Sequence, residues 1–232
     1  MKVGIMQPYF FPYIGYWQLM SSVDKYVIYD DVNYIKGGWI NRNKILMNGK
    51  SKMINLKMKG ASPNKLINEV FVAKDEIYNR KLLRTIEYCY KKAPYFSNVF
   101  PLVEEIILYN EEVLSTYLEN SIRKIAKYLE MNTEIILSSD LNKDNSLKGQ
   151  DKIIEICRIL GATEYYNAKG GINLYSKEIF DYNGIKIRFI ETKLFEYFQH
   201  INKFEPNLSI IDVLMFNSKE EVKELLSLYH LI

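Results

Sequence analysis

The first residues of the chain constrain the fold more than any other segment. They read "KVGIM", a loop with Pro8 and Pro12, a helical stretch "YWQLMSSV", and a second apolar run "KYVIYDD". Proline fits neither a β-ladder nor the middle of a helix, so both prolines place the connection between strand and helix in a loop. Strand, loop, helix and strand within roughly thirty residues is the pattern of a βαβ unit, whose strands are parallel.

The rest of the sequence continues this alternation on both sides of a helical block. We expect one sheet with strands at residues 2–6, 26–30, 134–138, 163–166 and 185–190. The predicted fold class is therefore α/β, with an open, mostly parallel, Rossmann-like sheet in a single domain over residues 1–232. The amphipathic stretch at about 75–129 predicts a largely helical insertion, which we expect beside the sheet and over part of the ligand cleft.

Two shorter patterns predict further elements. The segment "RNKILMNGKSKMINLKM" is typical of a β-hairpin, because its "NG" suits a tight two-residue turn. The last segment, "SKEEVKELLSLYH", predicts a capped helix at the end of the chain.

Composition excludes several classes of function. The 232 residues are 48% hydrophobic, and 31 basic residues face 28 acidic ones without a long basic run, so nucleic-acid binding is not expected. No stretch reaches the roughly 18 apolar residues of a membrane span. The first apolar run lacks a basic leader, and the two cysteines lie in helical patterns, so we expect a cytoplasmic protein. No Cys/His cluster has metal-ligand spacing, so we expect no metal.

Ligands of such sheets bind beyond the carboxyl ends of the strands, which directs attention to the loops that follow them. The first loop, "QPYFFPYIGY", combines prolines with aromatic side chains. Taken singly, each aromatic residue is more often a packing residue. Taken together on a proline-braced loop, they predict a cleft wall that stacks a sugar or a nucleobase. The substrate-binding candidates from this loop are Gln7, Pro8, Tyr9, Tyr13, Gly15 and Tyr16.

The loop after the second predicted strand offers a carboxylate pair and an arginine. Asp30 and Asp31 are candidate catalytic residues, and the alternative is a helix cap or a solvated pair. Arg42 is the best anion ligand in the sequence, because guanidinium binds phosphate and carboxylate in a bidentate manner, although a surface ion pair is an equal alternative. We expect Arg42 to line one pocket with Gln7 and Tyr16. The other candidates from this loop are Trp39, Asn41 and Asn43.

Two later segments supply the remaining candidates. The segment "AKGGINLY" contains a glycine turn that either cradles an anion or is a plain turn. Its candidate ligand-binding residues are Lys169, Gly170, Gly171 and Tyr175. His200 is a candidate general base, since histidine has an unperturbed pKa of about 6.5, and the alternative is an exposed loop histidine.

These motifs resemble a known family. "QPYFFPYIGY" and "VDKYVIYDDVNYIKGGWINRNKI" are similar to the WbqC-like family, and so are "KKAPYF", "GQDKIIEICRILGATEYYNAKGGINLY" and "KFEPNLSIIDVLMFN". The resemblance covers essentially the whole chain. It implies a bacterial protein whose gene is frequently found among those for O-antigen and other surface polysaccharides.

The first βα unit also resembles, less closely, nucleotidylyltransferases of the HIGH superfamily. Here "YIGY" stands in place of their small-histidine signature, with Tyr13 and Tyr16 where that family has histidines. Gly15 still permits a close approach of backbone to phosphate. A neutral tyrosine does not stabilise a pentavalent phosphate as imidazolium does, so nucleotide binding survives the change better than adenylyl transfer.

The family resemblance and the candidate cleft together lead to a functional expectation. We expect an acyl or aminoacyl transferase that acts on a nucleotide-linked amino sugar, with a nucleotide or acyl donor as cosubstrate and no tightly bound cofactor. An acyl carrier protein is a candidate partner, and the oligomeric state stays open. The alternatives are a HIGH-type nucleotide-binding enzyme without adenylyl transfer and a non-enzymatic sugar-nucleotide binding or scaffold protein.

Overall fold

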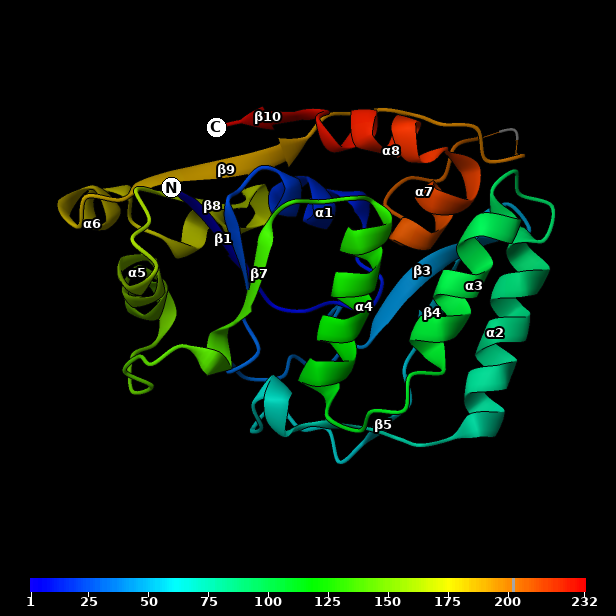
Figure 1. The fold of residues 1–232 in the computed structure, drawn as a ribbon, viewed down its shortest axis with the longest axis horizontal. Helices are drawn as coiled ribbons and strands as arrows, with labels where there is room; N and C mark the ends of the chain where they lie inside the picture. The colour runs from blue at the N-terminus through cyan, green and yellow to red at the C-terminus, as the bar shows by residue number, and fades with distance from the viewer. Residues whose placement is uncertain (202) are drawn as a thin grey trace.

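A six-stranded sheet with the order β10-β9-β8-β1-β2-β7 forms the centre of the fold (Figure 1). The structure is a computed structural model and describes residues 1–201 and 203–232. All neighbouring strands are parallel except β10, which pairs antiparallel with β9 at one edge. The strands are β1 Lys2–Met6, β2 Lys25–Ile28, β7 Glu134–Leu137, β8 Glu164–Ala168, β9 Lys186–Thr192 and β10 Tyr229–Leu231.

The five strands predicted from the sequence all lie in this sheet, so the predicted open α/β fold is confirmed. The sixth strand was missed. The expected C-terminal helix ends at Leu226, and the chain then extends so that Tyr229 pairs with Thr192. This pairing covers the open edge of β9, whose backbone groups would otherwise have no partner in the sheet.

Helices cover both faces of the sheet, because side chains alternate between faces along each strand. On one face, Val3 and Val27 belong to an apolar cluster with residues of α5 and α6. On the other face, Tyr26 and Ile28 belong to a second cluster with residues of α1, α4, α7 and α8. The helices are α1 Ile14–Ser21, α4 Leu114–Tyr128, α5 Gly149–Ile159, α6 Lys177–Tyr182, α7 Ile210–Phe216 and α8 Lys219–Leu226.

Residues 75–129 contain α2 Glu76–Tyr90 and α3 Phe96–Ile107 in addition to α4. Figure 1 shows α2 and α3 on the side of the molecule away from α5 and α6. Helix α2 packs against α3 and against β3 Arg42–Met47, which forms a hairpin with β4 Lys50–Asn55. The hairpin turn has Asn48 and Gly49 at positive φ, which matches the predicted "NG" turn. No helix in residues 1–201 and 203–232 is long and apolar enough to cross a membrane. The smaller strands are β3 Arg42–Met47, β4 Lys50–Asn55, β5 Met58–Lys59 and β6 Phe71–Val72.

A buried carboxylate joins these parts. Asp212 in α7 accepts hydrogen bonds from the Tyr90 hydroxyl at 2.8 Å, the Tyr197 hydroxyl at 2.6 Å and Gln199 Nε2 at 2.7 Å. The Tyr90 hydroxyl also accepts from the Leu46 amide of β3 at 2.9 Å. Burial raises the pKa of Asp212, although the three donors act in the opposite direction. Asp212 therefore connects α2, the hairpin and the segment after β9.

We predict that Asp212→Ala lowers the free energy of unfolding at neutral pH by about 3 kcal/mol, because buried donors lose their acceptor. The control is Asp181→Ala, which removes an exposed carboxylate from α6 and should change stability by less than about 0.5 kcal/mol. Urea unfolding of both variants and the parent measures this difference. Equal midpoints for Asp212→Ala and the parent would contradict the structural role.

Candidate functional site

A cavity of about 690 Å³ opens at the carboxyl ends of β1 and β8. The chain runs from β1 to β2 and β7 on one side, then returns to β8 and β9 on the other, so the strand order reverses between β1 and β8. Such a reversal leaves a crevice between diverging connections, where ligands of open α/β sheets bind. Met6 and Gln7 line the cavity from β1, and Asn167 and Ala168 line it from β8.

Many predicted substrate-binding residues come together in this cavity. Those in its lining are Gln7, Tyr9, Tyr13, Gly15, Tyr16, Trp39, Asn43, Gly170, Gly171 and Tyr175. The lining residues that the sequence did not single out are Ile5, Met6, Pro12, Leu19, Tyr29, Ile35, Ile153, Asn167, Ala168, Leu174 and Asn207. Whether the first group binds a substrate stays a prediction. None of the described lining residues lies between 75 and 129, so the helical block gives no wall to the cavity.

The loop after β1 is held in place by hydrogen bonds that other elements donate to its buried backbone carbonyl groups. Asn43 Nδ2 donates to the Phe10 carbonyl at 3.1 Å and to the Phe11 carbonyl at 2.8 Å. The Ser209 hydroxyl also donates to the Phe11 carbonyl, at 2.9 Å. Phe11 has a φ of 44°, an uncommon conformation for a residue other than glycine. Side chains of β3 and the start of α7 therefore fix the loop that carries the aromatic wall.

The N-terminus of α1 faces the cavity. Tyr13 precedes the helix without a capping side-chain hydrogen bond, and Tyr13, Gly15 and Tyr16 all line the cavity. The Tyr13 ring lies against Gly15, where a Cβ atom would be 2.5 Å from the ring and 2.8 Å from Thr192 Oγ1. A glycine is therefore needed here for the ring to keep its place, and the start of α1 forms part of the cavity wall.

The tyrosines of this wall are neutral hydrogen-bonding groups. Burial raises the pKa of Tyr9, Tyr13 and Tyr16 above the ordinary phenol value. Tyr16 packs between Tyr9 and Tyr26, with ring centroids 5.6 and 5.4 Å away. The Tyr16 hydroxyl is enclosed in the wall next to Tyr26. The phenols of Tyr9 and Tyr13 can donate hydrogen bonds to a ligand, but they do not act as bases near neutral pH.

Asn167 organises the opposite wall. Its Nδ2 donates to the hydroxyls of Tyr165 at 2.8 Å and Tyr175 at 3.0 Å, and its Oδ1 accepts from the Ala168 amide at 2.7 Å. Gly171 lies so close that an added Cβ atom would be 3.1 Å from Asn167 Nδ2. Asn167 thus positions the turn into the short 3₁₀ helix Lys169–Leu174. An asparagine near a strand end, three residues before a double glycine, was the available sequence signal.

Charged side chains are missing from the described lining. It contains no Asp, Glu, Lys, Arg or His. Lys169, expected to add charge to the glycine turn, instead pairs with Glu191 at 2.6 Å outside the lining. Pro8 and Asn41 also lie outside it, and Asn41 is bonded to Tyr34 and to the Leu56 carbonyl. The cavity can therefore recognise a ligand through aromatic faces, amides and hydroxyls.

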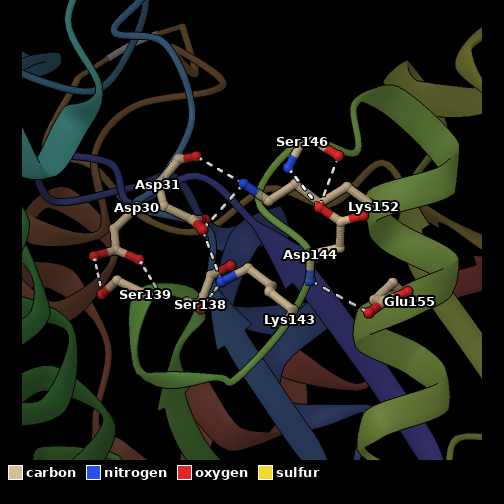
Figure 2. A network of polar contacts seen from close by, with 9 residues as sticks. All are labelled: Asp30, Asp31, Ser138, Ser139, Lys143, Asp144, Ser146, Lys152 and Glu155. Carbon is tan, nitrogen blue, oxygen red and sulfur yellow. Dashed lines mark hydrogen bonds and ion pairs between the residues drawn. The ribbon is translucent and has the colours of Figure 1, made fainter.

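Asp30 and Asp31 belong to a polar network behind the cavity wall, not to its lining (Figure 2). Asp31 Oδ2 lies 2.7 Å from Lys143 Nζ and 3.0 Å from Lys152 Nζ, and both lysines are buried. Lys152 also donates to the Asp31 carbonyl at 2.9 Å. Asp30 accepts from the amide and the hydroxyl of Ser139, at 3.0 and 2.7 Å. Neither carboxylate lines the cavity, and a catalytic role for either stays a prediction.

The environment separates the two carboxylates electrostatically. Burial raises the pKa of Asp30, and the Ser139 hydrogen bonds only partly oppose it. Burial also acts to raise the pKa of Asp31, but nearby Lys143, Ser138 and Lys152 outweigh it, so this pKa is lowered. Lys152 Nζ lies 5.4 Å from the ring centroid of Tyr29, which lines the cavity. The network therefore supports the cavity wall from behind.

The expected pocket position of Arg42 is wrong, whereas the role of His200 as a general base stays a prediction. The Arg42 guanidinium lies outside the lining, because Nε donates to the Gly38 carbonyl at 3.0 Å and Nη2 donates to Gly37. His200 also lies outside it and packs its ring against Phe198 and Phe216, at centroid distances of 4.5 and 5.5 Å. Arg42 therefore does not share the pocket with Gln7 and Tyr16. Within residues 1–201 and 203–232, no three His, Cys, Asp or Glu side chains gather as metal ligands would.

Comparison with known proteins agrees with the motif resemblance. The model of the WbqC-like protein family matches residues 7–224, nearly the whole chain. The chain belongs to the WbqC-like protein family. It is 27% identical over 229 residues to an uncharacterized protein, Rv1507c, of Mycobacterium tuberculosis (strain ATCC 25618 / H37Rv), with 97% of each chain covered. No solved structure matches this WbqC-like protein.

We predict that Gly15→Ala lowers the free energy of unfolding by about 1–3 kcal/mol, because the new methyl group displaces the Tyr13 ring. Gly170→Ala is the matched control: Gly170 also lines the cavity, but an added Cβ atom there meets nothing within 4 Å. Thermal and urea unfolding compare the two variants. Equal stabilities would show that Tyr13 moves aside without cost.

We predict that Asp31→Asn lowers stability by roughly 3 kcal/mol near pH 7, because two buried ammonium groups lose their counter-ion. The folded-state pKa of Asp31 is lowered, so its stabilising contribution is full above the unfolded value of about 3.9 and is lost as pH falls through the folded value. The difference between variant and parent should therefore shrink in acid.

Urea unfolding at neutral and at strongly acidic pH tests this pattern. The control is Asp140→Asn, which removes an exposed carboxylate from the segment after β7 that also carries Lys143, and it should change stability little at either pH. A deficit for Asp31→Asn that is the same at both pH values would argue against the ion-pair network.

Proposed function

We propose that this WbqC-like protein binds a nucleotide-linked amino sugar in the cavity and catalyses transfer of an acyl or aminoacyl group to the sugar amine. One observation carries the proposal. The cavity of about 690 Å³ lies where the strand order reverses, and its lining is aromatic and polar but uncharged. Sugars and nucleobases are recognised by flat aromatic faces and neutral hydrogen-bonding groups. The link to surface polysaccharides that the family resemblance implies also supports this substrate class.

Two kinds of group are available to such a ligand. Tyr9, Tyr13 and Trp39 offer ring surface to a sugar or base. The Gln7 side chain lines the cavity and has no hydrogen-bond partner among the described residues, so its amide is free to bind hydroxyl or acylamino groups. A ligand that pairs with this amide would satisfy a half-buried polar group.

The proposed reaction needs little acid–base catalysis from the protein. The neutral sugar amine attacks the carbonyl carbon of an acyl thioester, a C–N bond forms, the C–S bond breaks, and the amine proton leaves with the thiol. Since the cavity lining has no strong base, the chain would accelerate this step by holding amine and thioester in reactive geometry. The exposed side chains of Ile35 and Leu174 at the cavity give an apolar approach for the acyl group.

A second function is favoured by a separate observation. Tyr13, Gly15 and Tyr16 line the cavity at the start of α1, the place of the HIGH-type signature. This arrangement supports a nucleotide-binding protein that lacks adenylyl transfer, because neutral phenols do not stabilise the charge of a pentavalent phosphate. The two functions differ in product: only the first yields an N-acylated sugar nucleotide.

A thermal-shift panel separates them, because a ligand that binds only the folded state raises its melting temperature. We predict that nucleotide-linked amino sugars raise the melting temperature more than nucleoside triphosphates or free sugars do. Gln7→Ala should abolish this shift without changing the melting temperature of the free protein. The control is Asn110→Ala, which alters an exposed amide between α3 and α4, outside the lining.

Mass spectrometry then tests transfer, with the amino sugar nucleotide and an acyl thioester as substrates. A mass gain of one acyl group on the sugar nucleotide, dependent on the protein, is the expected result. A shift with nucleoside triphosphates alone, without acylated product, would favour the second function. No shift with any nucleotide sugar would contradict the proposal.

A further inference from the structure

Trp39 is an exposed aromatic residue of the cavity lining, and two cationic side chains lie next to its ring. Trp39 lines the cavity, yet 42% of its surface is exposed. The Arg42 guanidinium carbon lies 5.9 Å from the centre of the Trp39 ring, and Lys44 Nζ lies 5.8 Å from it. Positions 42 and 44 lie on the same face of β3, because side chains alternate along a strand. We call Trp39, Arg42 and Lys44 the cationic rim.

The charge of this rim is not balanced by the protein. Neither Arg42 nor Lys44 makes an ion pair within residues 1–201 and 203–232. The acceptors of Arg42 are the neutral carbonyls of Gly37 and Gly38, which hold the guanidinium but do not neutralise it. Three other lysines near the cavity are paired: Lys143 and Lys152 with Asp31, and Lys169 with Glu191.

The rim and the cavity offer complementary chemistry to one molecule. The described cavity lining has no charged side chain, so it suits a neutral sugar or base. The rim combines two like charges with an aromatic ring within about 6 Å, the range of cation–π contact. Because the Coulomb attractions of the two cations add, an anion at the rim is attracted by both. A molecule with a neutral part and an anionic part can use both surfaces at once.

We infer that the cationic rim binds the phosphate or diphosphate group of the ligand whose neutral part enters the cavity. Two backbone carbonyls orient the Arg42 guanidinium by accepting from Nε and Nη2. Its remaining N–H groups are free for bidentate contact with phosphate. Lys44 adds a point charge from the same strand. The inference deepens the proposed function, since it assigns the anionic part of the same substrate, but it can be tested without a sugar nucleotide.

Inorganic pyrophosphate is the probe, because it carries the anion without the neutral part. Binding is measured by titration calorimetry at low ionic strength and by tryptophan fluorescence. Trp39 is exposed at the rim, whereas the other tryptophan, Trp17, is fully buried, so a fluorescence change that disappears in Trp39→Phe locates the site. We expect saturable binding that weakens as salt is added, because exposed charges are screened.

Lys44 is the residue to change, because Arg42 also holds its own loop. Lys44→Gln should weaken pyrophosphate binding about tenfold or more, the effect of losing a hydrogen bond to a charged group. Lys44→Arg should retain binding. Lys81→Gln removes the same charge from an exposed position on α2 and should bind as the parent does. Circular dichroism checks folding, and Lys44→Met serves as a second neutral variant.

The outcomes separate this inference from the proposed function. Equal pyrophosphate affinity for the parent and both neutral Lys44 variants overturns the rim, whatever the nucleotide panel shows. So does affinity that salt does not change, or the absence of binding by either method. Pyrophosphate binding that depends on Lys44, together with no response to any nucleotide sugar, would support the rim and contradict the proposed substrate.

Discussion

The carbonyl groups of Phe10, Phe11 and Pro12 impose the constraint on which the rest of this structure depends. A loop of prolines and bulky aromatics buries its backbone, and buried carbonyls need donors. Those donors come from three separate elements: Trp17 of α1 to Pro12 at 3.1 Å, Asn43 of β3 to Phe10 and Phe11, and Ser209 before α7 to Phe11. The aromatic wall is rigid because the hairpin and α7 close on the loop.

The same constraint explains how charge is distributed around the cavity. The Asn43 side chain is fully engaged, because Nδ2 donates to the loop and Oδ1 accepts from the Lys44 amide. The phenols of the wall stay neutral because burial raises their pKa. Charged groups lie elsewhere, with Asp31 and its two lysines outside the lining and Arg42 and Lys44 at the rim. The cavity thus has an uncharged interior and a cationic edge.

Much of this arrangement can be predicted from sequence, because strand periodicity and proline positions are local signals. The five parallel strands and the polar loops after them follow from such signals, and so does the meeting of Gln7, Tyr13 and Tyr16 at one cavity. The positions of Arg42 and the carboxylates do not. A pattern shows which side chains a loop carries, but the capture of Arg42 by Gly37 and Gly38, or of Asp31 by Lys143 and Lys152, depends on tertiary geometry.

This dependence on distant donors links the cavity to the stability of the whole fold. The loop after β1 is adjacent in sequence to α1, but its donors Asn43 and Ser209 come from the hairpin and from the other end of the chain. Local opening of the hairpin or of α7 would leave the Phe11 carbonyl without its donors and loosen the aromatic wall at the same time. The wall is therefore part of the cooperative core, unlike a loop that orders only on binding. A ligand that packs on Tyr9 and Tyr13 would stabilise the hairpin and α7 as well as the loop it contacts.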